Sequence, residues 1–200
     1  MERFTTPVAP CLYPFLQKPK VDPNGEYPSI YQITLVLDKA NKEHGELLQH
    51  ISNLHKESKG SEDKKPIKKH TDAEGKETGL YTIRFKCKAE FLPWVPTYDA
   101  QGTPDHRPEN YVANDSKVRV NWSYGFYKQG GGGVSLYLNG VQIIDLIEWK
   151  GLSAEAMGFD KVDGYVKDTT PKEFESTAES NINAPSQTAE PSDTDEDVPF

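Results

Sequence analysis

The chain has 200 residues, a formal net charge of −8 and 35% hydrophobic residues. No run of about 18 apolar residues occurs, which argues against a transmembrane helix, and "MERFTTPVAP" lacks the pattern of a secretory signal. Ten tyrosines, eight phenylalanines and three tryptophans can fill one β-rich core. Cys11 and Cys87 have no CxxC spacing, which favours reduced thiols in a cytoplasmic protein over a disulfide between them.

The negative charge is concentrated in the last part of the chain. Residues 168–200 contain nine acids and one base, for a net charge of −8, so residues 1–167 are neutral overall. The same segment is rich in Thr, Ser, Ala, Pro and Asn, and Phe174 and Phe200 are its only aromatics. Such a composition cannot bury enough apolar surface to offset the entropy lost on folding. We therefore predict a folded domain over residues 1–167 and a disordered acidic tail over 168–200.

The first half of the chain predicts two strands and one helix. Residues 4–16 are apolar but contain three prolines, which indicates an irregular or edge strand. Apolar and polar residues alternate over 30–37, as in a strand half-facing water. Asp38 is placed to cap a helix over about 39–58, whose apolar residues recur at helical spacing. Residues 59–79 have almost nothing to bury and predict a mobile loop.

Two later segments show clear strand alternation. In residues 80–91, apolar side chains alternate with threonine and cations. A long proline-containing loop separates this strand from residues 117–128, which alternate again. In that second segment the pattern places Phe126 inward and Tyr127 outward.

The glycine run "QGGGG" predicts a flexible hairpin connection to a last strand over 134–149, broken at Asn139-Gly140. A short helix is expected from Ser153 to Gly158. About five strands and one main helix make the domain mainly β and suit a small closed or partly open barrel.

Cations recur on the outward faces of the two alternating strands. Arg84, Lys86 and Lys88 lie at every second residue, about 7 Å apart, which suits the phosphates of an extended single strand. Lys117 and Arg119 repeat this spacing on the second strand. The alternative is an ordinary polar sheet face whose lysines prevent edge pairing, and the pattern alone favours that alternative.

Other cations and aromatics extend this predicted surface. The lysines of "DKKPIKKH", residues 63–70, form either a phosphate-binding arm or a solvated loop, and the nearby acids favour the loop. Aromatic rings near the cationic strands can stack on unpaired bases while the cations follow the backbone. The predicted DNA-binding residues are Lys18, Lys20, Arg84, Lys86, Lys88, Trp94, Tyr98, Lys117, Arg119, Tyr127 and Lys128.

The sequence ends in a run of acids followed by Val-Pro-Phe. "DEDVPF" resembles the acidic tip of bacterial single-stranded DNA-binding proteins, where acids precede an aliphatic-Pro-Phe ending. The resemblance implies that the tip docks on replication and repair enzymes, with the phenylalanine in an apolar pocket and basic residues against the acids. The alternative is an acidic tail of no special function. The predicted partner-docking residues are Asp193, Asp195, Glu196, Asp197, Val198, Pro199 and Phe200.

The body resembles a second family. "YPFLQKPK" at 13–20, "GVSLYLNGVQII" at 133–144 and "AMGFDKVDGYV" at 156–166 are similar to phage-encoded single-stranded DNA-binding proteins with an OB-fold. This resemblance implies an OB-fold-like five-stranded antiparallel barrel in the host cytoplasm. One feature departs from the usual OB-fold, which places its helix between strands three and four. Here the predicted helix precedes the 80–91 strand, so either an early strand is split or the topology varies.

The two resemblances together imply a non-catalytic protein without metal or cofactor that binds single-stranded DNA regardless of sequence, in phage replication, recombination and repair. The tip would recruit a polymerase, helicase-primase or exonuclease. The division of charge between residues 168–200 and the rest of the chain predicts that the tail competes with DNA for the groove, so that duplex DNA could also bind once the tail is removed. No membrane partner is expected.

Two other classes of function remain open. The segments "PD" at 104–105 and "DSK" at 115–117 fit a loose magnesium-dependent nuclease pattern, with Asp105, Asp115 and Lys117 as its residues. A protein-only replication adaptor would use the tail without binding DNA.

Overall fold

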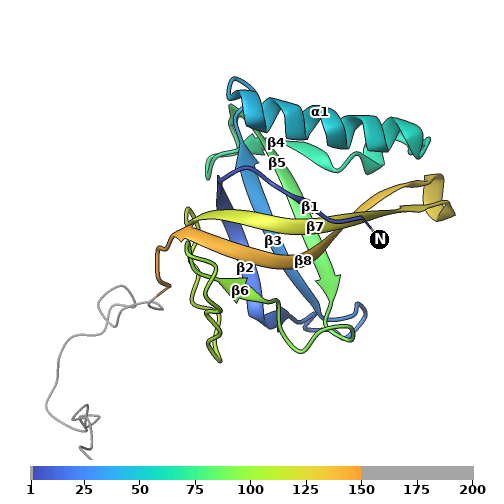
Figure 1. The fold of residues 1–200 in the computed structure, drawn as a ribbon. Coiled ribbons are helices and arrows are strands. Elements are labelled where there is room, and N and C mark those ends of the chain that lie inside the picture. Colours follow the sequence, from blue (N-terminus) through green and yellow to red (C-terminus); the bar gives the residue numbers. More distant parts are fainter. Residues whose placement is uncertain (1, 150–200) are drawn as a thin grey trace, which may run out of the picture. The chain divides into compact units, whose positions relative to one another are not determined.

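Five strands form a closed barrel in the computed structural model, which describes residues 2–149 (Figure 1). The pairing order is β2–β3–β5–β8–β7 and back to β2, antiparallel except between β5 and β8. This mainly β barrel with one main helix is OB-fold-like and confirms the predicted fold class. The predicted tail, the helix at 153–158 and the boundary at 167 lie outside the described residues. The barrel strands are β2 (Ala9–Lys20), β3 (Ile30–Leu37), β5 (Glu77–Lys88), β7 (Lys117–Tyr127) and β8 (Gly133–Asp145).

Shorter elements border the barrel. One α-helix, α1 (Lys42–Glu57), lies across one end of the barrel (Figure 1). The short strands β1, β4 and β6 pair with β7, β5 and β8 respectively. Within residues 2–149, no helix is both long and apolar enough to cross a membrane. The remaining elements are β1 (Phe4–Thr5), η1 (Glu62–Lys64), β4 (Ile67–Thr71), β6 (Thr97–Tyr98) and η2 (Gln129–Gly131).

The first barrel strand is irregular, as predicted, but it is not an edge strand. β2 pairs with β7 at Ala9 and Pro10 and with β3 from Cys11 onward, with shifts in register along its length. The prolines are tolerated because β2 changes partners and does not form one continuous ladder. Cys11 of this strand is buried and forms no disulfide, and burial raises the pKa of its thiol to about 12.

The helix begins later than the sequence predicted. Its N-cap is Asn41, whose side-chain oxygen accepts a hydrogen bond from the His44 backbone N–H at 3.2 Å. Asp38 instead accepts from the N–H of Ala40 at 2.8 Å, in a turn that precedes the helix. The apolar stripe is confirmed and packs into the barrel core through Leu47, Leu48, Ile51 and Leu54. As predicted, the helix lies before β5, so it joins the second and third barrel strands.

Residues 59–79 are more ordered than the predicted mobile loop. They contain η1 and β4, and β4 pairs with β5 from Ile67 opposite Ile83 to Thr71 opposite Glu77. The strand was missed because β4, which pairs only with β5, buries little side-chain surface. Its sequence, IKKHT, therefore lacks the alternation of apolar and polar residues that would have predicted a strand.

The two alternating strands behave largely as predicted. Ile83 and Phe85 of β5 are fully buried, and the alternating cations Arg84, Lys86 and Lys88 are exposed. Phe126, however, is 47% exposed, because the ends of β7 and β8 project beyond the barrel as a hairpin (Figure 1). The expected break in the last strand is a bulge, since Asn121 pairs with Gly140 and Trp122 with Leu138.

Candidate nucleic-acid interface

An open groove of about 700 Å³ lies on the outer face of β3 and β5, and we call it the cationic groove. It receives side chains from β2, from the connection between α1 and β5, and from the β7–β8 hairpin. Its lining residues are Tyr13, Gln32, Thr34, Asp63, Lys64, Lys65, Pro66, Lys68, Thr82, Arg84, Lys86, Tyr127, Val134, Ser135 and Leu136.

The floor of the cationic groove follows from strand register. Arg84 lies opposite Thr34 and Lys86 opposite Gln32 in the β3–β5 ladder. Because side chains alternate between the two faces of a strand, these polar residues face outward while their neighbours fill the core. Lys86 also pairs with Tyr137 of β8, the single bridge that joins β5 and β8 in the described structure. The floor therefore lies along the seam where the barrel closes.

Two walls rise from this floor. One carries the lysines that follow α1, and the other is the β7–β8 hairpin with Tyr127. The walls are joined where the Ser61 N–H donates to the Gly131 carbonyl oxygen at 3.2 Å. A Cβ atom on Gly60 would lie only 2.8 Å from the Cα of Gly133, so a side chain at Gly60 would push the hairpin away. The close contact holds the hairpin beside the groove.

The groove is strongly positive. Five lysine or arginine side chains line it against one acid, Asp63. Lys65 is hydrogen-bonded to Glu62 at 2.9 Å, and this bond lowers the pKa of the Glu62 carboxyl. Arg84, Lys86 and Lys68 form no ion pair with any residue of the 2–149 range. These three cations are therefore available to an anionic ligand.

The sequence predicted only part of this groove. Of the predicted DNA-binding residues, the groove contains Arg84, Lys86 and Tyr127. It also contains Lys64, Lys65 and Lys68, from the segment whose lysines the sequence favoured as a solvated loop. Their high density in "DKKPIKKH" was the available signal.

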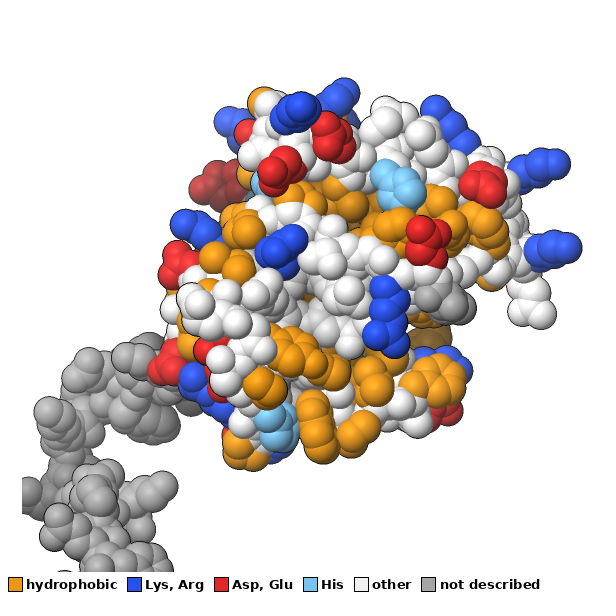
Figure 2. All heavy atoms as spheres, viewed as in Figure 1, with side chains coloured by type: hydrophobic (Ala, Val, Ile, Leu, Met, Phe, Trp, Pro, Cys, Tyr) orange, Lys and Arg blue, Asp and Glu red, His pale blue; other side chains and the backbone are white. Residues whose placement is uncertain are grey.

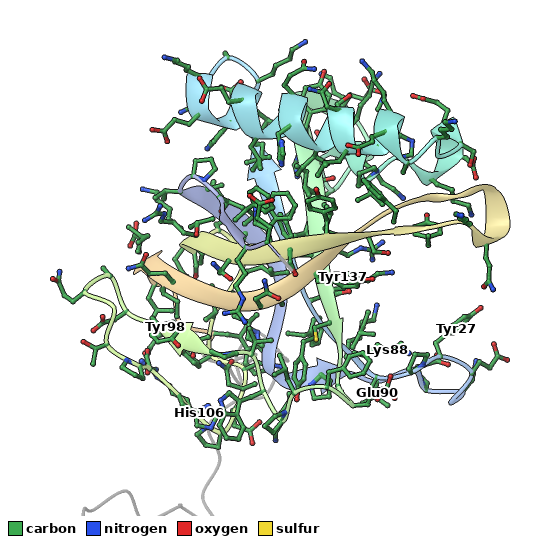
Figure 3. The ribbon with its side chains drawn as sticks, turned by 45° about the vertical axis from the view of Figure 1, so that its right-hand side comes forward. Tyr27, Lys88, Glu90, Tyr98, His106 and Tyr137 are labelled. Atoms are coloured by element: carbon green, nitrogen blue, oxygen red, sulfur yellow. The ribbon has the colours of Figure 1, made fainter. Side chains whose placement is uncertain are left out.

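Other predicted cations lie outside the groove. Lys88 forms an ion pair with Glu90 at 2.9 Å (Figure 3), and Lys117 lies 3.5 Å from Asp145. Arg119 donates to the Thr6 carbonyl oxygen at 3.3 Å and lines a separate cavity of about 400 Å³. In Figure 2, Lys and Arg side chains are scattered over the visible face among acidic ones.

Three further predicted cations are exposed but do not line the groove. Lys18 pairs with Glu109. Lys20 ends β2, and Lys128 directly precedes η2. Their part in DNA binding stays a prediction.

The two predicted aromatics of the 89–116 loop also lie apart from the groove. The ring of Trp94 stacks on His106, with centroids 4.4 Å apart, and Trp94 is 41% exposed. Tyr98 of β6 is exposed as well, and Figure 3 shows it with His106 on one side of the barrel's lower end, away from Lys88. Stacking of either ring on a base stays a prediction.

Two of the three residues of the nuclease pattern, Asp105 and Lys117, are engaged in other contacts. The Asp105 carboxylate pairs with Arg107 at 3.3 Å, and the Lys117 ammonium faces Asp145. Across residues 2–149, no three His, Cys, Asp or Glu side chains are grouped so that they could hold a metal ion.

Comparison with solved structures reveals the same fold in phage proteins. Gp2.5, a single-stranded DNA-binding protein of bacteriophage T7, matches with a TM-score of 0.58 and 19% identity over 84% of this chain and 99% of that one. The single-stranded DNA-binding protein of bacteriophage Enc34, solved with single-stranded DNA, matches with a TM-score of 0.58 and 19% identity over 74% of this chain and 89% of that one. The chain shares the fold of these phage single-stranded DNA-binding proteins.

A C-terminally truncated form of the Enc34 protein matches with a TM-score of 0.54 and 20% identity over 72% of this chain and 86% of that one. No protein-family model and no curated protein sequence matches the chain. The likeness is thus one of fold, and the assignment of binding residues rests on the geometry of the groove.

Proposed function

We propose that this chain is a non-catalytic protein that binds single-stranded DNA regardless of sequence, in phage replication, recombination and repair. The cationic groove carries this proposal. OB-folds bind oligonucleotides on the face of their second and third strands, next to the loops that join strands one to two and four to five. Here that face is formed by β3 and β5, and the β7–β8 hairpin is the connection of strands four and five. The three unpaired cations lie on or beside that face.

The mechanism needs only backbone contacts and stacking. The ammonium and guanidinium groups of the floor and wall neutralise successive phosphates and release counterions. Tyr127 offers a ring for base stacking, which tolerates any base because every base has a π-face. The shared fold supports this mechanism, since the Enc34 neighbour was solved with single-stranded DNA.

A fluorescence anisotropy titration with a labelled single strand tests the proposal. If about four phosphates are neutralised, log K against log salt should have a slope of about −3, at roughly 0.7 per contact. Mixed and homopolymeric sequences should bind alike. A slope near zero, or the absence of binding, would contradict the proposed DNA-binding function and favour a protein-only adaptor. Magnesium-dependent cleavage in a parallel gel would identify a nuclease instead.

We also propose that the acidic tail has two roles. Its residues 193–200 recruit a polymerase, helicase-primase or exonuclease, and its negative charge competes with DNA for the cationic groove. The charge division supports the second role, because −8 lies in residues 168–200 and the rest of the chain is neutral. Both ligands would be anions that contact the same cations.

Deleting residues 170–200 should tighten binding of single strands several-fold at low salt. A flexible chain of about 30 residues has a typical end-to-end distance of about 30 Å, enough to reach a groove on a domain of this size. The tail then acts at a millimolar effective concentration. Salt screens both competitors, so the difference should close at high salt, and duplex DNA should bind better without the tail. Fluorescence anisotropy of the full-length and truncated proteins at two salt concentrations measures these affinities. Equal affinities of the two proteins at low salt would show that the tail does not compete with DNA and serves only to recruit partners.

Tyr127 and its neighbour Phe126 provide a matched pair for the stacking role. Tyr127 lines the groove, whereas the adjacent position on a strand faces the other way, and Phe126 is already 47% exposed. Tyr127→Ala should weaken binding by about ten-fold, since base stacking contributes about 1–3 kcal/mol per base. Phe126→Ala should leave the affinity within about two-fold. Equal losses from both substitutions would show that the hairpin as a whole matters, and not the ring in the groove.

A further inference from the structure

A second groove adjoins the cationic groove and has the opposite character. It has a volume of about 520 Å³ and is lined mainly by apolar side chains, among them Pro14, Phe15, Val112 and Trp149. Its one charged lining residue is Glu109, which is already paired with Lys18. We call it the apolar groove. Without unpaired cations along it, the apolar groove is not built to hold phosphates.

The two grooves share one residue, Tyr13, whose side chain lines both and is 60% exposed. Its backbone has a φ of 52°, a left-handed conformation that is an outlier for a bulky residue. The Tyr13 N–H donates to the side-chain oxygen of Asn114 at 2.7 Å, which holds this conformation. Strained residues of this kind persist where the surroundings fix them, and they gather at binding sites.

The walls of the apolar groove are held from both sides. The side-chain oxygen of Asn110 accepts from the N–H groups of Leu16 and Gln17, at 3.0 and 2.8 Å. The Trp149 N–H donates to the Tyr111 carbonyl oxygen at 2.7 Å. The Trp149 side chain itself is 63% exposed. The groove is thus preformed, with an exposed aromatic ring at Tyr13 and another at Trp149.

We propose that the apolar groove is a nucleobase subsite, into which the single strand passes from the cationic groove over Tyr13. The inference rests on the proposed function and adds where the bases go. Phosphates stay with the cations, and unstacked bases lie against Tyr13 and Trp149, which offer the faces that bases stack on. Both amide groups of Asn110 are engaged by backbone groups, and the Asn114 side-chain oxygen accepts from the Tyr13 N–H. Stacking on an aromatic face tolerates any base, so we expect the subsite to accept any sequence.

Abasic probes test the subsite directly, with the full-length chain. Three labelled single strands of about ten nucleotides, within the OB-fold range, are compared: one complete, one with about four abasic positions at its 5′ end, and one with them at its 3′ end. All three keep the same phosphates. One of the two abasic probes should bind the unmodified protein about ten-fold more weakly than the complete strand, and the other should lose less.

Trp149→Ala should weaken binding of the complete strand by about the same ten-fold, and the sensitive abasic end should then cost nothing further. Trp149→Phe, which keeps an aromatic face, should restore most of the affinity. Tyr13→Gly should also weaken binding without lowering the thermal midpoint, because glycine adopts positive φ without strain. Tyr27, 71% exposed and outside both grooves, is the matched control, and Tyr27→Ala should bind as the unmodified protein does.

Three outcomes would overturn the subsite. The first is a Trp149→Ala protein that binds the complete strand as tightly as the unmodified protein. The second is an abasic penalty that survives the substitution. The third is tighter binding by Trp149→Ala, which would show that the chain's own residues beyond 149 occupy the groove. In each case, salt-sensitive binding of the unmodified protein would leave the proposed function standing, and only its loss on every probe would remove both.

Discussion

Alanine at Arg84, Lys86 and Lys68 should weaken single-strand binding by about two to three orders of magnitude at about 0.05 M salt. Each phosphate contact contributes roughly 0.7 to the slope of log K against log salt, so the slope should fall from about −3 to about −1. The loss should be the same for all sequences, because phosphates carry no sequence information. Anisotropy titrations at several salt concentrations measure both quantities. The three side chains are exposed, so the thermal midpoint should hardly change.

The matched control removes the same charge elsewhere. Lys69, Lys88 and Lys117 each lie within 3.5 Å of a carboxylate and do not line the cationic groove. Replacing these three with alanine should cost no more than a few-fold, since their charges are already partly neutralised. This control also tests Lys88 and Lys117, which the sequence placed in the interface. Equal losses from the two sets would mean that overall charge, and not the groove, attracts the strand.

Phe200→Ala should weaken recruitment of the partner enzyme by about 30-fold or more and leave DNA affinity unchanged. A buried aromatic anchor commonly contributes 2 kcal/mol or more to a small interface, which corresponds to about a 30-fold or greater loss. The substitution leaves every charge of the tail in place, so competition with DNA should persist. Surface-immobilised protein presented with purified phage polymerase, helicase-primase or exonuclease gives the affinity.

Phe174 is the natural control, because it is the other aromatic residue of the segment 168–200. Phe174→Ala should bind the partner as the unmodified protein does, since it lies outside the "DEDVPF" pattern. If both substitutions weakened the partner equally, general hydrophobicity of the tail would explain recruitment. An undiminished affinity of Phe200→Ala would disprove the tip as an anchor.

The sequence predicted those features that depend on local periodicity. Alternation over 80–91 is enough to place Phe85 in the core and Arg84 outside it, because the side-chain period of a strand is two residues. The stripe of α1 is equally local, and the glycine run marks a connection wherever the flanking strands pair. The barrel, with β-rich composition and one helix, followed from these elements and from the resemblance to phage proteins.

The features that the sequence did not predict depend on distant partners. The left-handed backbone of Tyr13 is held by Asn114, a residue 101 positions away, and nothing near Tyr13 in sequence signals it. β4 forms because part of β5 has an edge that is free for pairing. Phe126 is exposed because the β7–β8 hairpin extends beyond the barrel. The helix cap at Asn41 was missed for another reason. Asp38 is an equally good capping residue, and only the turn between the two residues determines at which of them the helix begins.

The long connection between β3 and β5, residues 38–76, contributes to the ligand surface but is not needed to order the barrel strands. These strands are antiparallel neighbours, and two residues could join them, yet 38–76 intervene. The inserted residues carry α1, the lysine-bearing wall of the cationic groove and Gly60, against which the hairpin rests. The connectivity of the barrel does not require them. A change of length or charge in residues 38–76 would therefore alter the ligand surface while leaving the order of the barrel strands as it is.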